Sequence, residues 1–296
     1  MSVSAVAVSA SRSPLVGVAL VVMATFLLAS HDAFTKYLSG FYSIVLVVWA
    51  RYAVHTSLMA VFFLPRSGVK VLRSQRPLLQ GVRALCLLAT SLLFVAALAY
   101  IPLAEATAVN FVAPLLVTAL SMPLLGERVS PAQWLAVITG FVGVLMVVHP
   151  GSDLFTPAIL LPLGSALCFC FYQLLTRVLS KVDSPVTSNF LTGLINTVLM
   201  SMAVPFFWAW PTAEHALMLF TVGAFGMLAH QFITNAYHHA PPALLAPLGY
   251  SQIVFAGLLG FVVFKQLPAP LSLVGIAVVC ASGLAVVWLS QRAVTK

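Results

Sequence analysis

Ten apolar runs, each long enough to cross the hydrocarbon core of a bilayer, constrain this chain more than any other feature. A transmembrane helix needs about 20 mostly apolar residues, so ten of them use roughly 200 of the 296 residues. Only short loops and tails remain, which leaves no room for a soluble catalytic or nucleic-acid-binding domain. Breaks in hydropathy place the runs at 15–38, 42–64, 79–99, 103–124, 131–149, 157–180, 186–208, 216–237, 243–264 and 270–289.

The low share of charged residues agrees with this interpretation. Charged residues make up 7% of the chain, against about 25% in ordinary soluble domains, so the chain could not cover a water-facing surface. The four cysteines all lie within apolar runs and form no CxxC pair, which is typical of small core residues. We therefore predict an all-α membrane protein and expect neither a cofactor nor a bound metal.

The distribution of Lys and Arg predicts the orientation. If both termini lie on one side, ten basic residues fall on that side and only Lys36 and Lys265 on the other. Cytoplasmic loops of membrane proteins collect basic residues, which also accounts for the pI near 9.6 without a nucleic-acid partner. We expect a multi-pass membrane protein with cytoplasmic tails at 1–13 and 291–296.

An internal repeat divides the chain. "TKYLSGFYSIV" (35–45) matches "TRVLSKVDSPV" (176–186) at an offset of 141, and at an offset of 139 Pro102 matches Pro241 and Pro131 matches Pro270. We expect two five-helix halves, at 14–149 and 155–290. Because five is odd, the second half inserts upside down, which produces the inverted repeat that many transporters use to alternate access to a midplane site.

The segment "ALAYIPLAEATAVNFVAPLLVTALSMPLLGERVSPAQWLAVITGFVGVLMVV" (97–148) resembles the EamA domain of the drug/metabolite transporter superfamily. The features that carry the resemblance are Pro102-Leu103-Ala104, Pro114, Gly126-Glu127-Arg128, Trp134 and the stretch from Gly140 to Val144. A second, degenerate copy follows, with Gln266 replacing the turn glutamate and Ile253 the mid-helix proline. The resemblance implies small-molecule transport through a central cavity. Members carry amino acids, drugs, vitamins and sugars, in either direction.

Polar and ionisable residues inside the apolar runs are the candidate site. A charge at a helix centre costs about 2.5–3.5 kcal/mol on insertion scales, so such residues are retained for a function or for pairing within the bundle. The candidate substrate-binding residues are His31, Asp32, Arg51, Glu105, Asn110, Tyr172, Gln173, His230, Gln231, Tyr250 and Gln252.

The dyad His31-Asp32 has two interpretations. At the repeat offset of 141 its counterparts are Tyr172 and Gln173, and matched polar dyads favour a site astride the repeat axis. Alternatively, Asp32 pairs with Lys36 one helical turn away and closes the outer end of the helix.

Other candidates also remain open. Arg51, close to the midplane, either ties to Glu105 or Asp32 or provides the counter-charge for an anionic group of a substrate. Glu105 is either a proton carrier or an ordinary interfacial acid, and His230-Gln231 either line the cavity or form core hydrogen bonds. We expect Arg83, near the cytoplasmic end of its run, to extend its side chain to the interface.

The preferred function is a secondary transporter that exports a small polar, amino-acid-like metabolite across the inner membrane by alternating access. The alternatives are an uptake permease for a vitamin-like ligand such as a flavin and, more remotely, a channel or structural membrane protein. An enzyme is disfavoured because the chain has no HExxH, P-loop, GxGxxG or GxSG-like motif. The expected partners are a small-molecule substrate and the lipid bilayer, with proton coupling as one option and a monomer or homodimer as the assembly.

Overall fold

A computed structural model of the chain describes residues 14–126, 129–148, 156–240 and 242–294. The first half contains α1 (Pro14–Leu38), α2 (Ile44–Ser67), α3 (Pro77–Leu98), α4 (Leu103–Asn110), α5 (Ala113–Leu125) and α6 (Pro131–Val147). The second contains α7 (Leu160–Leu179), α8 (Pro185–Ala203), α9 (Ala213–His239), α10 (Pro242–Leu245), α11 (Ser251–Phe264) and α12 (Pro270–Val294). Each of the ten predicted runs is helical. Eight are long and apolar enough to cross a membrane, and the other two are the shorter apolar helices 131–147 and 248–264.

Polar residues at the hydropathy breaks determine where helices begin. Ser130 accepts a hydrogen bond from the Gln133 backbone N–H, and the Gln133 side chain accepts one from the Ser130 N–H, which forms a capping box. Ser184 caps α8 by accepting from Thr187 N–H. A proline follows each of these serines at the first helical position, where its missing N–H costs nothing.

The fourth and ninth spans are broken helices. In the fourth, α4 ends at Asn110 and α5 begins at Ala113, one residue before Pro114. In the ninth, the short α10 passes through a 3₁₀ turn at Ala246–Tyr250 before α11 begins. The interruptions therefore fall in corresponding spans of the two halves. In a membrane, such backbone is tolerated where it is buried in protein or borders a cavity.

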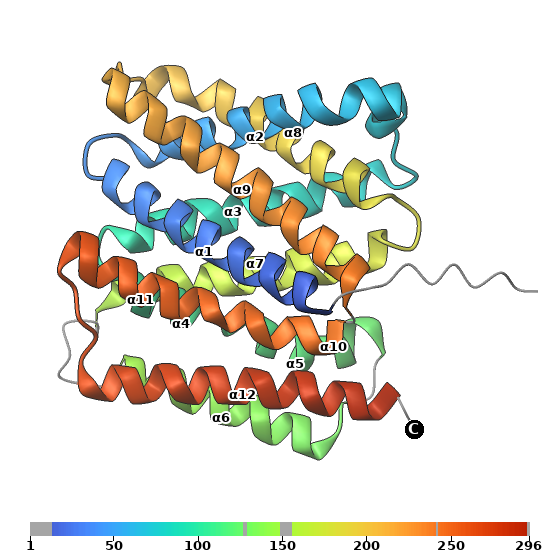
Figure 1. The fold of residues 1–296 in the computed structure, drawn as a ribbon, viewed down its shortest axis with the longest axis vertical. Coiled ribbons are helices and arrows are strands. Elements are labelled where there is room, and N and C mark those ends of the chain that lie inside the picture. The colour runs from blue at the N-terminus through green and yellow to red at the C-terminus, as the bar shows by residue number, and fades with distance from the viewer. Residues whose placement is uncertain (1–13, 127–128, 149–155, 241, 295–296) are drawn as a thin grey trace, which may run out of the picture.

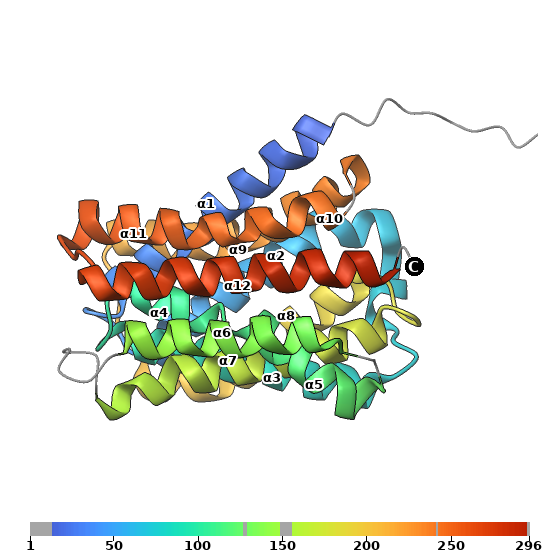
Figure 2. The same cartoon turned by 90° about the horizontal axis from the view of Figure 1, so that it is seen from below.

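The contacts between the halves follow the repeat. α1 packs against α9, and their equivalents in the other half, α7 and α3, also pack against each other. The equivalent helices α6 and α12 lie side by side along one edge of the bundle (Figures 1 and 2). The two helices can approach closely because Gly143 and Gly275 have no side chains at the contact. A Cβ added to Gly143 would lie only 2.9 Å from the Gly275 carbonyl oxygen.

The helices share a common long direction, so the bundle has two ends. The start of α1 and the end of α12 lie at the same end, which we call the termini end (Figure 1). The other end, which we call the opposite end, carries an aromatic group in which Trp208 contacts both Trp49 and Trp210 edge-on. Such aromatic residues are typical of a membrane–water interface. Large apolar side chains such as Leu145 and Phe206 are exposed around the bundle, as expected where lipid is the solvent.

Candidate functional site

A cavity of ≈ 180 Å³, the central cavity, lies between the two halves. Helices α1 to α5 contribute side chains from the first half, and α7, α9 and α11 contribute from the second. Its lining residues are Leu28, His31, Asp32, Arg51, Leu87, Thr90, Ser91, Phe94, Thr107, Asn110, Phe111, Pro114, Phe169, His230 and Gln252. The cavity thus combines charged and amide groups with an aromatic wall.

Asp32 is held by two side chains at the wall of the central cavity. His31 Nδ1 lies 2.9 Å from Asp32 Oδ1, and Gln252 Nε2 donates to Asp32 Oδ2 at 3.0 Å. Only 8% of Asp32 is exposed, so the carboxylate is oriented by neighbours from both halves rather than by water. The His31 Nε2 atom has no hydrogen-bond partner among the described residues.

The alternative in which Asp32 pairs with Lys36 is wrong. Lys36 Nζ donates to the backbone carbonyls of Leu98 at 2.6 Å and Ile101 at 2.8 Å. It also lies 5.6 Å from the centroid of the Phe264 ring. Because carbonyl oxygens at the end of α3 lack intrahelical partners, they attract the ammonium group away from Asp32.

Arg51 borders the central cavity, and most of its donors have no acceptor among the described residues. One guanidinium nitrogen donates to Ser91 Oγ at 3.1 Å, and the group lies 5.3 Å from the centroid of the Tyr52 ring. The structure shows no ion pair between Arg51 and either Glu105 or Asp32. Of the two interpretations of Arg51, the internal tie is therefore not formed, and the guanidinium is available to a group that enters the cavity.

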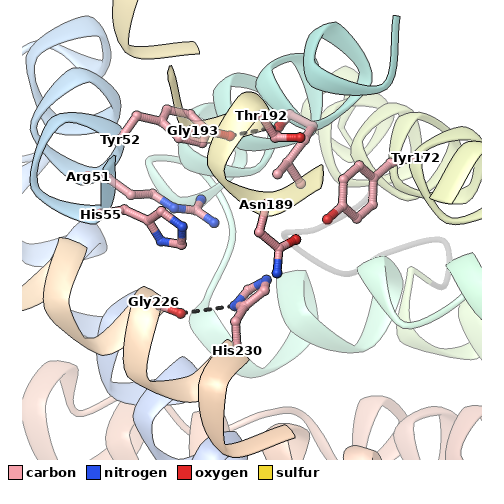
Figure 3. A pocket seen from close by; sticks show the side chains of 10 residues that line it. Arg51, Tyr52, His55, Tyr172, Asn189, Thr192, Gly193, Gly226 and His230 are labelled. Carbon is pink, nitrogen blue, oxygen red and sulfur yellow. Dashed lines mark hydrogen bonds between the residues drawn. The ribbon is translucent and has the colours of Figure 1, made fainter. Parts of the chain in front are cut away.

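A second, smaller cavity of ≈ 30 Å³ adjoins the central one, and we call it the side cavity. Arg51, Leu87 and His230 line both cavities. The other residues around the side cavity are Tyr52, His55, Tyr172, Asn189, Thr192, Gly193 and Gly226. Figure 3 shows the polar ends of Arg51, Asn189 and Tyr172 directed into the same space. The His55 and His230 rings meet edge-on, with centroids 6.2 Å apart.

The predicted site residues separate into two groups. His31, Asp32, Arg51, Asn110, His230 and Gln252 line the central cavity, and Arg51, Tyr172 and His230 line the side cavity. Glu105, Gln173, Gln231 and Tyr250 line neither. The Tyr250 ring packs 5.3 Å from Phe111, in a cluster that also includes Ala108 and Ile253.

The expectation that Arg83 extends to the membrane surface is wrong. Only 1% of the residue is exposed. Its guanidinium donates to Thr176 Oγ1 at 2.6 Å, to the Ser188 carbonyl oxygen at 2.9 Å, to Thr192 Oγ1 at 2.6 Å and to Tyr172 OH at 2.8 Å. A fifth acceptor, Asn189 Oδ1, lies at 3.5 Å. All five acceptors are neutral, and all belong to α7 or α8. Arg83 therefore joins the first half to the second.

Asp183 forms a related link at the termini end, between the connections that join α2 to α3 and α7 to α8. It accepts hydrogen bonds from the Ser74 hydroxyl, from Gln75 N–H at 3.0 Å and from Gln80 Nε2 at 2.9 Å. Burial alone would raise the pKa of Asp183, but these hydrogen bonds outweigh it and hold the pKa below its usual value. The carboxylate is thus ionised at neutral pH and ties the two connections together.

Sequence reasoning missed several lining residues. Asn189 and Thr192, which line the side cavity, recur at helical spacing on α8 with the buried Asn196, so a polar stripe in an apolar run could have indicated them. The Phe side chains of the central cavity carry no such signal, because most Phe residues of this chain occur in apolar runs. Among the described residues, no group of three or more His, Cys, Asp or Glu side chains could hold a metal ion.

Comparison with known families fixes the identity of the fold. The model of the EamA-like transporter family matches the chain twice, at residues 15–149 and 156–288. The chain belongs to this family. It is therefore a multi-pass membrane transporter of the drug/metabolite transporter superfamily and not an enzyme.

Curated relatives of this EamA-family protein transport different compounds. An S-adenosylmethionine uptake transporter of Rickettsia bellii is 23% identical over 268 residues, covering 90% of this chain and 92% of its own. A riboflavin transporter of Vibrio cholerae is 33% identical over 189 residues, covering 63% of each chain. The pseudopaline exporter CntI of Pseudomonas aeruginosa is 27% identical, covering 88% of this chain and 91% of its own.

The fold also occurs in a solved structure. A crystal structure with 22% sequence identity matches at a TM-score of 0.64 and covers 95% of this chain and 100% of that one. At this identity the match supports the arrangement of the EamA-family helices, and nothing about the compound carried.

Proposed function

We propose that the protein is a secondary transporter that exports a small polar, amino-acid-like metabolite across the inner membrane by alternating access. The observation that carries this proposal is the central cavity, in which the Arg51 guanidinium and the Asp32 carboxylate occur together. Groups of opposite charge in one cavity suit a substrate that has both an acidic and a basic group. The lining comes from both halves, so rocking of one half against the other would open the cavity to one side at a time.

Uptake of a vitamin-like ligand such as a flavin is the second candidate. Riboflavin transporters among the relatives favour it, as do Phe94, Phe111 and Phe169 in the cavity wall. The volume favours the smaller substrate, because ≈ 180 Å³ is below the about 300–1,000 Å³ of pockets that enclose drug-sized ligands.

The orientation and coupling are part of the same proposal. The excess of Lys and Arg at the termini end supports a cytoplasmic location for that end and for the tails 1–13 and 291–296. The boundary between the halves, at 149–155, would then lie outside the cell. Glu105 supports proton coupling, since it is buried on α4 and its Oε2 atom has no hydrogen-bond partner among the described residues. A monomer encloses the whole cavity, and a homodimer is compatible with it.

Untargeted metabolomics of deletion and overexpressing cells tests the direction and the substrate class. We expect an amino-acid-like compound to accumulate in the cytosol of the deletion strain and in the medium of the overexpressing strain. Depletion of a flavin from the cytosol of the deletion strain would instead support uptake. Unchanged metabolite pools in both strains would contradict transport of a small metabolite.

A further inference from the structure

We infer that the side cavity is a binding site for the carboxylate group of the substrate, with Arg51, Tyr172 and Asn189 as its donors and Arg83 as the group that orients two of them. The inference rests on the proposed function and adds what the substrate must contain. A carboxylate is required, whereas the corresponding carboxamide or amine is rejected.

The lining of the side cavity is rich in hydrogen-bond donors and contains no carboxylate. Arg51 uses one donor on Ser91 and keeps others for the cavity. Tyr172 OH accepts from Arg83 at 2.8 Å, so its own hydrogen is left to donate elsewhere. The Asn189 carbonyl oxygen faces Arg83 at 3.5 Å, and its amide nitrogen turns into the cavity beside His230 (Figure 3).

The charges around the side cavity favour an anion. Arg51 lines it, and Arg83 lies directly behind its Tyr172 and Thr192 walls. Neither arginine pairs with a carboxylate in the described part of the chain. The described acids nearby do not supply one: Asp32 is hydrogen-bonded to His31 and Gln252, Asp183 is hydrogen-bonded to the connection before α3, and Glu105 lines neither cavity. Two positive charges, the half-buried Arg51 and the almost fully buried Arg83, therefore meet around a side cavity whose lining contains no carboxylate.

The size of the side cavity fits one functional group rather than a whole substrate. A cavity needs about 10–15 Å³ to hold one water, so ≈ 30 Å³ has room for about two waters or the two oxygens of a carboxylate. Because Arg51, Leu87 and His230 line both cavities, a carboxylate placed there leaves the rest of the molecule in the central cavity. The amino group then faces Asp32, and an apolar side chain faces the aromatic wall.

Gly226 offers a way to fill the side cavity without disturbing the fold. It lines the cavity on α9, and an added Cβ would have a single neighbour within 4 Å, His31 Cδ2 at 3.9 Å. Gly257 on α11 is a matched control: its added Cβ would likewise have one neighbour, Ala104 Cβ at 3.9 Å, and it lines neither cavity. Alanine also suits a helix interior better than glycine, so both variants should fold.

The test is calorimetric titration of the purified full-length protein with three matched sets of probes. Each set contains an L-amino acid (alanine, methionine or phenylalanine), its carboxamide and its decarboxylated amine. We expect at least one acid to bind wild type at least tenfold more tightly than its amide and amine. Gly226→Ala should weaken the binding of that acid at least tenfold, and Gly257→Ala should leave it within twofold.

Two results would overturn the inference, and they are distinguishable. Equal binding of an acid, its amide and its amine to wild type would reject the carboxylate site while leaving an amino-acid-like substrate in place. Binding of none of the nine probes would reject the proposed substrate class together with the carboxylate site. If Gly226→Ala fails to fold, as judged by thermal unfolding, the comparison of acid with amide on wild type decides alone.

Discussion

Arg51 and Arg83 are both arginines of the first half that lie within membrane-spanning helices, yet their surroundings differ. Arg51 is half-buried, makes one described hydrogen bond, to Ser91, and borders both cavities. Arg83 is almost fully buried and donates to neutral acceptors on α7 and α8 of the other half. The first guanidinium has donors left for a ligand, and the second has its donors engaged by the protein.

The difference separates the two tasks that a buried charge can have in a membrane protein. A charge at membrane depth costs free energy, so its donors must be satisfied by the protein or by something that enters. Arg83 is satisfied by the protein, and it therefore joins the halves and orients Tyr172. Arg51 is left incompletely satisfied, which we interpret as readiness for a substrate anion.

Arg51→Gln should give the largest loss of transport. The Arg51 guanidinium can donate two parallel hydrogen bonds to a carboxylate, and charge-assisted hydrogen bonds are worth about 1.5–3 kcal/mol each. We therefore expect its loss to lower transport about 100-fold or more, while membrane abundance stays near that of wild type. Arg51→Lys keeps the charge without the planar fork and should rescue only partly. Transport assays normalised to protein abundance check this, and near-normal transport by Arg51→Gln would remove Arg51 from the site.

Arg83→Met should act mainly on stability. Five described hydrogen bonds between the halves are lost, and at about 0.6 kcal/mol for each bond inside a membrane the loss is about 3 kcal/mol. Thermal unfolding of the purified protein should therefore shift to clearly lower temperature than for Arg51→Gln. Equal unfolding temperatures for the two variants would contradict the distinction between the two arginines.

Asp32→Asn should lower transport about tenfold and leave membrane abundance unchanged, since removing a charge at membrane depth eases insertion. Because Lys36 donates to the Leu98 and Ile101 carbonyls instead, Lys36→Gln should act through the end of α3 and not reproduce the Asp32→Asn phenotype. Transport by both variants, measured in the same cells, separates the two effects. A Lys36→Gln phenotype identical to that of Asp32→Asn would show that the two residues act as a pair.

Asp183→Asn should have the smallest effect, a fall in unfolding temperature of about 2–4 °C, the shift expected for about 1 kcal/mol. The folded-state pKa of Asp183 is lowered, so its contribution to stability is fully present above the usual value of 3.8 and is lost as pH falls through the lowered pKa. The difference between wild type and Asp183→Asn should therefore be constant from about pH 5 to pH 8 and shrink in stronger acid. Unfolding curves at several pH values check this, and a difference that grows on acidification would contradict it.

The sequence predicts the spans well because hydropathy and proline positions depend only on local residues. The predicted start of the fourth run at residue 103 matches the start of α4. Partners far apart in the chain could not be predicted in the same way. Gln252 lies 220 positions from Asp32, and nothing in the local sequence indicates that its amide reaches that carboxylate.

The two basic residues that were misplaced show the same limit. Lys36 is near the end of its span and one turn from an acid, so a local pair is the obvious expectation, yet the carbonyls at the end of α3 take its ammonium group. Arg83 is near a span end and would reach water if α7 and α8 did not supply its acceptors. Tertiary contacts between the halves decide both positions, and these contacts depend on the inverted packing rather than on neighbouring residues.

The central claim, that one cavity between the halves opens to one side at a time, is tested most directly by two-sided labelling. Three cysteines would be introduced into a variant without the native cysteines: one at Thr107, which lines the central cavity, and a pair at Ser74 and Asp183, which are hydrogen-bonded in wild type. The cysteine at position 107 would first be blocked reversibly. The pair would then be joined by a short bifunctional thiol reagent, or left unjoined, before the block at position 107 is removed.

With the termini end cross-linked, a membrane-impermeant reagent should reach position 107 from outside and not from the cytoplasm, and transport should stop. Without the cross-link, the reagent should reach it from both sides. Labelling from the cytoplasm in the cross-linked protein, or continued transport by it, would contradict alternating access at this cavity.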